Sequence, residues 1–135
     1  MSFTHTHRVR YHEADAQGIV FNSRYLEIAD VAMTEFFRAL GWSYDRLTAD
    51  GVDPSVVSAQ LTFRAPARFD EVLEFRVDCT RVGRSSFELH HTVTRAADEL
   101  AEITLVYVNV DSGRSSPLPE AVASALTDSR CLPGK

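Results

Sequence analysis

One long amphipathic segment, from Ser23 to Leu40, constrains the fold more than any other feature of the chain. Its apolar side chains recur at steps of three and four residues: Tyr25, Ile28, Ala29, Ala32, Met33, Phe36, Phe37 and Leu40. This spacing places them on one side of an α-helix. Asn22 or Ser23 suits the N-cap position, and Gly41 suits the position just after the helix. The segment therefore predicts a helix that must bury one face against another layer.

The chain after Pro54 changes to alternating and β-branched residues, which predict strands. The expected strands are Thr4 to Tyr11 before the helix and, after it, Val56 to Arg64, Glu71 to Val82, Ser85 to Arg95 and Ala101 to Val110. Short turn signals between the later strands favour a meander of four adjacent antiparallel strands. The nearly continuous apolar residues of the last strand indicate that it is covered on both sides.

The 135 residues suit a single domain, residues 1–135, because one chain of this length buries one core. A weaker helical turn is expected over Ser43 to Ala49. Residues after about 118 are interpreted as a tail with one short helical segment. One helix against one sheet places the chain in the α+β class.

Composition excludes several classes of function. The net charge of −5 argues against nucleic-acid binding, which requires a basic face. No apolar stretch approaches the roughly 20 residues that cross a bilayer, and the first residues do not resemble a signal peptide, so we expect a cytoplasmic protein without membrane insertion. Cys79 and Cys131 are expected to be reduced thiols. No metal site is expected, because adjacent histidines such as His90 and His91 face opposite sides of a strand.

An acidic turn precedes the helix and suggests chemistry. Asp15 and Gly18 lie just before the helix start, where unpaired backbone N–H groups attract negative charge. Hydrolysis of an activated carbonyl group needs a carboxylate that attacks the carbonyl carbon or activates water, together with donors for the developing oxyanion. Asp15 can supply the carboxylate, and the backbone amides of Asn22 and Ser23 can supply the donors. The alternative is that Asp15 only caps its turn.

Three segments resemble the 4-hydroxybenzoyl-CoA thioesterase family of hotdog-fold proteins. Tyr11 to Thr34 is similar to its acidic signature, Phe63 to Leu73 to a strand entry with Pro-Ala-Arg-Phe-Asp, and Val82 to Phe87 to its next hairpin. Their order and spacing agree over residues 5–118. The resemblance implies a hotdog fold, in which an antiparallel sheet wraps the long helix. It also implies that two chains pair into a continuous sheet, giving a homodimer or homotetramer.

The resemblance further implies an acyl-CoA thioesterase that converts a fatty-acyl or aryl thioester to the free acid and CoA. Asp15 then matches the catalytic carboxylate, acting as nucleophile or general base. No separate cofactor is implied, because coenzyme A is part of the substrate, and an acyl carrier protein thioester is the alternative substrate. Asn22 departs from the histidine of many bacterial relatives, so the chemistry depends more on Asp15 and the amides.

Substrate contacts are expected around the same turn. The candidates for the acyl group are Gly18, Ile19, Val20, Tyr25 and, farther along the helix, Asp30. The resemblance places CoA contacts at Arg84, Ser85 and Ser86, where an arginine and hydroxyl groups suit phosphates. Arg64 and Arg68 are weaker candidates for the same role.

Several residues keep a second interpretation. Glu13 competes with Asp15, but is better interpreted as a solvated charge or as the partner of an arginine. Asp30 is equally compatible with an exposed helix charge, and His12 with a surface position. Two other functions stay open for the whole chain: a hotdog hydratase or dehydratase, and a non-catalytic module that binds acyl thioesters or assembles with other chains.

Overall fold

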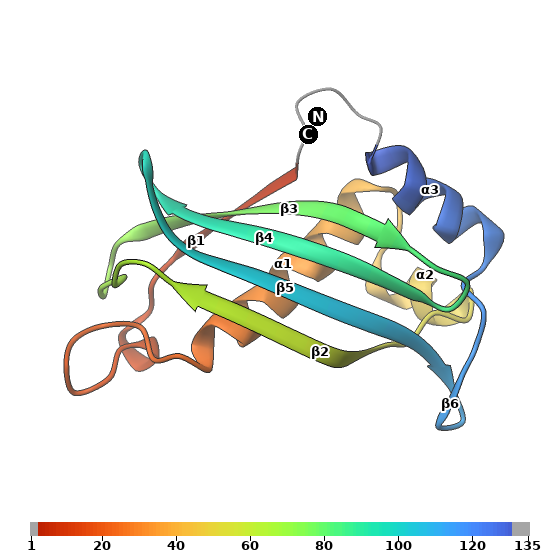
Figure 1. Ribbon diagram of the computed structural model, residues 1–135, viewed down its shortest axis with the longest axis horizontal. Coiled ribbons are helices and arrows are strands. Elements are labelled where there is room, and N and C mark those ends of the chain that lie inside the picture. Colours follow the sequence, from red (N-terminus) through yellow and green to blue (C-terminus); the bar gives the residue numbers. More distant parts are fainter. Residues whose placement is uncertain (1–2, 131–135) are drawn as a thin grey trace.

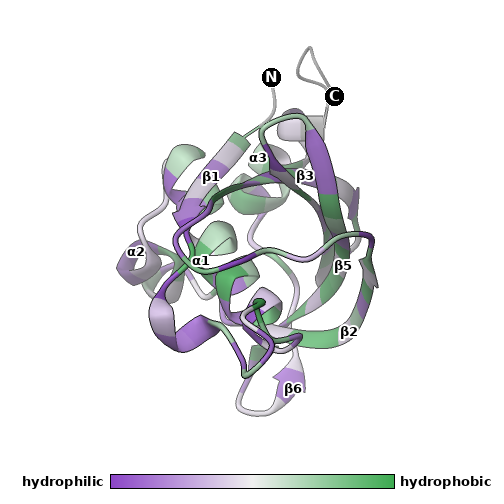
Figure 2. Ribbon diagram, turned by 90° about the vertical axis from the view of Figure 1, so that its left-hand side faces the viewer, coloured by the Kyte–Doolittle hydropathy of each residue, from purple (hydrophilic) through white to green (hydrophobic). Residues whose placement is uncertain are grey.

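The chain folds as one strongly curled antiparallel sheet around a long central helix, as the computed structural model, which describes residues 3–130, shows (Figure 1). Viewed from the end, the sheet curls around α1, and both carry stretches of hydrophobic residues (Figure 2), many of which are buried in the core. The elements are β1 (Phe3–Arg8), the 3-10 turn η1 (Tyr11–Glu13), α1 (Arg24–Ala39), α2 (Tyr44–Ala49), β2 (Pro54–Phe63), β3 (Val72–Val82), β4 (Ser86–Arg95), β5 (Asp98–Asp111), β6 (Arg114–Ser115) and α3 (Glu120–Arg130). This is the predicted hotdog architecture of the α+β class.

The central helix α1 confirms the prediction from apolar spacing. Its predicted core side chains are buried, apart from Leu40, which is partly buried at the helix end. Ser23 occupies the N-cap position, although its side chain makes no capping hydrogen bond. Gly41 follows the C-cap with a φ of 108°, a left-handed conformation that glycine adopts without a steric penalty.

The strand order is β1-β3-β4-β5-β2, which corrects the expected four-stranded meander. Only β3, β4 and β5 form a meander, while β2 pairs with β5 at the far edge. The segment between β2 and β3 contains Pro66, and its backbone is bound to Leu100, Val20 and Val9 rather than folded into a hairpin. It therefore crosses the end of the sheet before β3 begins.

One face of the sheet forms the core. The inward residues of β3 and β4 are buried as predicted: Leu73, Phe75, Val77 and Cys79, and Phe87, Leu89, His91 and Val93. The expectation that β5 is covered on both sides is wrong for the single chain, because its outward residues Thr104, Val106 and Val108 are only half-buried. The β-branched residues there suit a strand without requiring burial.

The last helix, α3, corrects the interpretation of the end of the chain as a tail. Val122 and Leu126, four residues apart, are almost completely buried and share one face of α3, which packs against β3. Leu118 also joins the core. This segment is therefore part of the folded unit.

Cys131 lies outside the described residues, whereas Cys79 is a buried thiol. Within residues 3–130, no helix is long and apolar enough to cross a membrane.

Candidate active site

The turn that carries Asp15 begins where β1 ends. The strand stops at Arg8 rather than continuing to Tyr11, because the next residues form the 3-10 turn η1. The Asp15 N–H donates to the Ile19 carbonyl at 2.9 Å, and the Gly18 N–H donates to the Asp15 carbonyl at 2.9 Å. Gly18 has a φ of 79°, which suits glycine. Asp15 thus lies in a small turn with its own hydrogen-bond network.

The Asp15 carboxylate has one oxygen engaged in this turn. Its Oδ1 accepts a hydrogen bond of 2.8 Å from the Gln17 N–H. The side chain is half-buried, and within residues 3–130 it forms no ion pair and its Oδ2 accepts no hydrogen bond. The capping role and the catalytic role predicted from the sequence are therefore compatible, because one oxygen holds the turn while the other stays available.

Backbone donors at the start of α1 complete this corner of the molecule. The Phe21 N–H donates to the Glu13 carbonyl, and the Arg24 N–H donates to the Phe21 carbonyl. Between them, the N–H groups of Asn22 and Ser23 have no acceptor in the part of the chain that the structure describes. They lie at the positive end of the helix dipole, which favours a developing negative charge. The structure thus leaves available the two amides predicted as oxyanion donors.

A pocket of about 340 Å³ lies beside the turn and brings together four predicted site residues, Ile19, Val20, Asn22 and Tyr25, with Arg64, a weaker candidate. It is lined by Ile19, Val20, Asn22, Tyr25, Phe63, Arg64, Ala65 and Pro66. The rings of Tyr25 and Phe63 meet edge to face, 5.2 Å apart. Burial raises the pKa of Tyr25, so its hydroxyl remains a proton donor. Asp15 and Gly18 do not line this pocket in the single chain.

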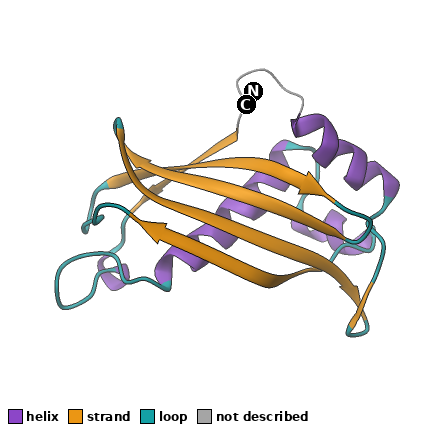
Figure 3. Cartoon of the chain, in the orientation of Figure 1, coloured by secondary structure: helices purple, strands orange, loops and turns teal. Residues whose placement is uncertain are grey.

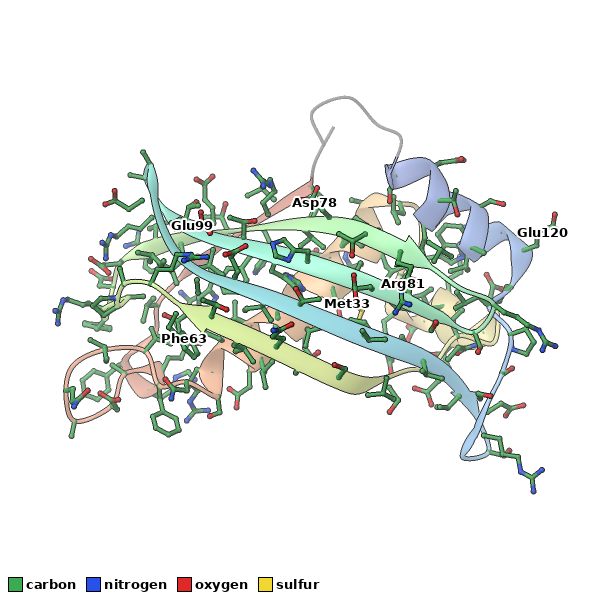
Figure 4. All side chains as sticks on the ribbon, in the orientation of Figure 1. Met33, Phe63, Asp78, Arg81, Glu99 and Glu120 are labelled. Carbon is green, nitrogen blue, oxygen red and sulfur yellow. The ribbon has the colours of Figure 1, made fainter. Side chains whose placement is uncertain are left out.

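A second pocket, of about 400 Å³, lies at the other end of β2. Its lining residues are Asp30, Met33, Thr34, Tyr44, Pro54, Ser55, Val56 and Tyr107. Figure 4 shows Phe63 of the first pocket at the end of β2 nearer the Asp15 turn, with Met33 of the second pocket farther along. The space between α1 and β2 therefore has one pocket at each end.

Asp30 and Tyr107 give the second pocket a polar character. Although Asp30 remains largely exposed, partial burial raises its pKa. Tyr107 is 1% exposed, and its hydroxyl has no hydrogen-bond partner among residues 3–130. Burial and the neighbouring Asp30 raise the pKa of Tyr107. Sequence reasoning missed Tyr107, although its inward position on β5 could have placed it in the core.

The predicted CoA contacts lie at the opposite end of the sheet from Asp15. Arg84 and Ser85 lie in the turn between β3 and β4, and Ser86 is the first residue of β4, at the right in Figure 1, whereas the Asp15 turn is at the lower left. Loops gather at both ends of the strands (Figure 3). A single chain therefore does not bring these three residues to Asp15.

Two of the other charged candidates, Glu13 and Arg64, have structural partners. Glu13 is neither solvated nor bound to an arginine side chain: it is 6% exposed and bonded to His7, which corrects the earlier interpretation. His12 is exposed, as expected. Arg64 lines the first pocket while it pairs with Glu99 and Glu102. No group of three potential metal ligands occurs within residues 3–130.

The antiparallel sheet curled around the long helix α1 defines a hotdog fold, and the carboxylate turn and open amides at the helix start are compatible with a thioester hydrolase. Comparison with known proteins gives the family. The chain belongs to the thioesterase-like superfamily, whose profile matches residues 9–126.

Individual relatives agree with this assignment. The chain is similar to a putative esterase of Aquifex aeolicus, 27% identical over 128 residues that cover 95% of this chain and 100% of the relative. It is also similar to the acyl-CoA thioester hydrolase YbgC of Escherichia coli, 28% identical over 120 residues that cover 87% and 90%. Among solved structures, hypothetical protein TT1821 of Thermus thermophilus has a TM-score of 0.89 and 33% identity, covering 93% and 98%.

Proposed function

We propose that this thioesterase hydrolyses an acyl-CoA to the free acid and CoA, with Asp15 as the catalytic carboxylate. The observation that carries the proposal is the available Asp15 oxygen on the turn that precedes the open amides of α1, since Ile19 and Val20, which follow on the same segment, line an adjoining pocket. The activity named for YbgC supports the choice of acyl-CoA. The reaction requires only water as second reactant, so no cofactor is proposed beyond the CoA of the substrate.

Two routes fit this geometry. In the first, Asp15 attacks the thioester carbon, the C–S bond breaks to release CoA, and water then hydrolyses the resulting anhydride. In the second, Asp15 removes a proton from water as the water attacks the same carbon. In both routes the carbonyl oxygen becomes negative, and the amides of Asn22 and Ser23 stabilise it.

The acyl group is proposed to occupy the space between α1 and β2. Ile19, Val20 and Tyr25 provide an apolar wall, and Gly18 leaves room on the turn for a ligand. Asp30 provides a polar contact at the second pocket. This lining suits a fatty-acyl or aryl group.

A second chain is proposed to close this space. No strand of the described residues 3–130 pairs with the outer edge of β2, and Val56, Val57 and Phe63 are 45%, 61% and 45% exposed. An exposed apolar edge strand favours pairing with another strand. Antiparallel pairing of two β2 strands gives a homodimer with one continuous sheet, and two such dimers give the homotetramer.

This pairing also accounts for the distant CoA contacts. The Phe63 end of β2 lies beside the Asp15 turn, whereas the Pro54 end lies near the β3–β4 turn, because Ser55 and Ser86 both pair with Val108. Antiparallel pairing therefore brings the β3–β4 turn of one chain toward the Asp15 end of the other. We propose that CoA phosphates bind there to Arg84, Ser85 and Ser86.

Turnover by the purified protein tests this function. Short, long and aromatic acyl-CoA esters, and the same acyl groups on acyl carrier protein, should be compared by release of free thiol. Hydrolysis of at least one acyl-CoA is expected. Because acyl-CoA thioesters are intracellular compounds, we also propose a cytoplasmic location for the protein. Binding without hydrolysis of any thioester would instead support the non-catalytic module.

Hydration of an enoyl thioester without thiol release would support the hydratase. The geometry disfavours that alternative, because no histidine within residues 3–130 bonds to Asp15. His7 is engaged with Glu13, and His12 is exposed.

We expect Tyr107→Phe to change substrate preference rather than the basic activity. The substitution removes only a buried hydroxyl that has no hydrogen-bond partner among residues 3–130, on a residue that lines the second pocket. For an acyl group with a distal hydroxyl, kcat/KM should fall by about 10-fold, the value of one lost hydrogen bond. The matched acyl-CoA without a hydroxyl should be hydrolysed as before. An equal change for both substrates would contradict a polar contact at Tyr107.

A further inference from the structure

We infer that His7 and Glu13 form a positioning pair that fixes the Asp15 turn relative to the sheet. The inference rests on the proposed function, because it assigns these residues a role in catalysis through Asp15. Neither side chain needs to touch the substrate. The pair connects a strand of the sheet to the base of the turn.

Glu13 binds both sides of the junction between β1 and the turn. Its carboxylate Oε1 accepts a 2.7 Å hydrogen bond from the Arg10 N–H, and its carbonyl accepts a 3.0 Å bond from the Phe21 N–H. The first contact fixes the 3-10 turn before Asp15, and the second fixes the segment between the turn and α1. Glu13 therefore holds the backbone on both sides of Asp15.

His7 fixes the same carboxylate to the sheet. Its Nε2 lies 2.8 Å from Glu13 Oε1, and the two side chains are 15% and 8% exposed. An ionised carboxylate only accepts hydrogen bonds, so the proton lies on His7 Nε2. His7 is opposite Leu73 in the pairing of β1 with β3, which gives its backbone a rigid support.

The surrounding charges favour an ionised Glu13. Burial opposes ionisation, but the Arg10 N–H and the His7 ring outweigh it, with a contribution from His12, so the pKa of Glu13 is lowered. His5 is the neighbouring inward histidine of β1, its ring centre 6.4 Å from that of His7. The negative charge of Glu35, on α1, acts to raise the pKa of His5. Of the two histidines, His7 holds the hydrogen bond to Glu13.

An apolar residue at position 7 would leave this buried carboxylate with one donor fewer. A buried charge that loses a partner moves toward water. Such a movement would break the contact of the carboxylate with the Arg10 N–H and shift the Glu13 backbone, whose carbonyl binds the Phe21 N–H, and would thereby displace Asp15. Misplacement of a catalytic group by about 1 Å can cost about 100-fold in rate.

The comparison of His7→Leu with His5→Leu tests the inference, because both remove an inward histidine from the same strand. For His7→Leu we expect kcat to fall about 10- to 100-fold while KM changes less than about 3-fold. His5→Leu should keep kcat within about 3-fold of the native enzyme. His7→Gln places a donor near the position of Nε2 and should restore most of kcat.

Thermal unfolding separates positioning from loss of fold, since rates are compared only for variants that remain folded at the assay temperature. If His7→Leu does not fold, Glu13→Gln provides the test, because a neutral amide weakens the same contacts without changing shape; kcat should again fall with KM retained. Equal kcat for His7→Leu and His5→Leu, or failure of His7→Gln to restore kcat, would overturn the inference. If Asp15→Asn also leaves hydrolysis unchanged, the proposed function itself fails.

Discussion

Replacement of Asp15 by asparagine is expected to lower kcat for thioester hydrolysis by about 10³-fold or more, with KM nearly unchanged. The amide retains an oxygen that can accept the Gln17 N–H, so the turn should keep its shape. It loses the negative charge that attacks the carbon or activates water. Because the substrate pocket is lined by other residues, binding should persist. Steady-state kinetics on the best acyl-CoA of the panel would measure both constants.

Glu13→Gln is the informative comparison, because it neutralises the other carboxylate of the same segment. Its expected loss is smaller, since Glu13 acts through the backbone rather than on the substrate. If Asp15→Asn retains the native kcat, Asp15 is not the catalytic carboxylate. Single-turnover hydrolysis in oxygen-18 water then separates the two routes. Label in the Asp15 carboxylate indicates the anhydride, and its absence indicates direct attack by water.

Local patterns were sufficient to predict most elements. The spacing of apolar residues defines α1 to within one residue at each end, because a helix that packs on a sheet must keep one apolar face. Alternation likewise gave the buried faces of β3 and β4. The order of the strands in the sheet could not be predicted from local patterns, because the position of β2 depends on its pairing with β5, which is distant in the sequence. No short segment encodes that pairing.

The helix α3 shows a different limit. Its burial depends on Val122 and Leu126 in a segment that is otherwise small or polar, so the apolar pattern is too short to stand out. Only its packing against β3 gives these residues their role. A short amphipathic segment is stabilised by its partner, which the sequence alone does not reveal.

The residues of the candidate site also fall into two groups, those that are close in the sequence and those that only the fold brings together. Asp15 and the amides of Asn22 and Ser23 are close in sequence, so turn and helix chemistry, together with the family resemblance, predicted them as site residues. Tyr107 and the pair of His7 and Glu13 depend on contacts between separate elements. The β3–β4 turn lies far from Asp15 in one chain, and its proposed role requires a second chain.

Acidification is expected to destabilise the fold through His91. This side chain is 0% exposed, and neither ring nitrogen has a hydrogen-bond partner within residues 3–130. Burial, reinforced by His90 and opposed by Asp78, lowers the pKa of His91 from 6.5 to about 4. Above pH 6.5 the histidine is neutral in both states and carries no penalty. As the pH falls from 6.5 to 4, the unfolded chain binds a proton that the folded chain does not, so stability decreases.

The expected loss from this group is about 3 kcal/mol between pH 7 and pH 4, since each pKa unit corresponds to about 1.4 kcal/mol. Urea unfolding at several pH values would measure it. Protonation of carboxylates such as Glu13 also lowers the stability of the fold in acid. The informative quantity is therefore the difference in pH dependence between the native chain and His91→Leu, in which position 91 cannot titrate. That variant should lose about 3 kcal/mol less over the same range. His90→Gln is the matched control, because His90 faces outward to Thr104, and it should keep most of the native pH dependence. Parallel curves for the native chain and His91→Leu would show that the buried imidazole does not control acid stability.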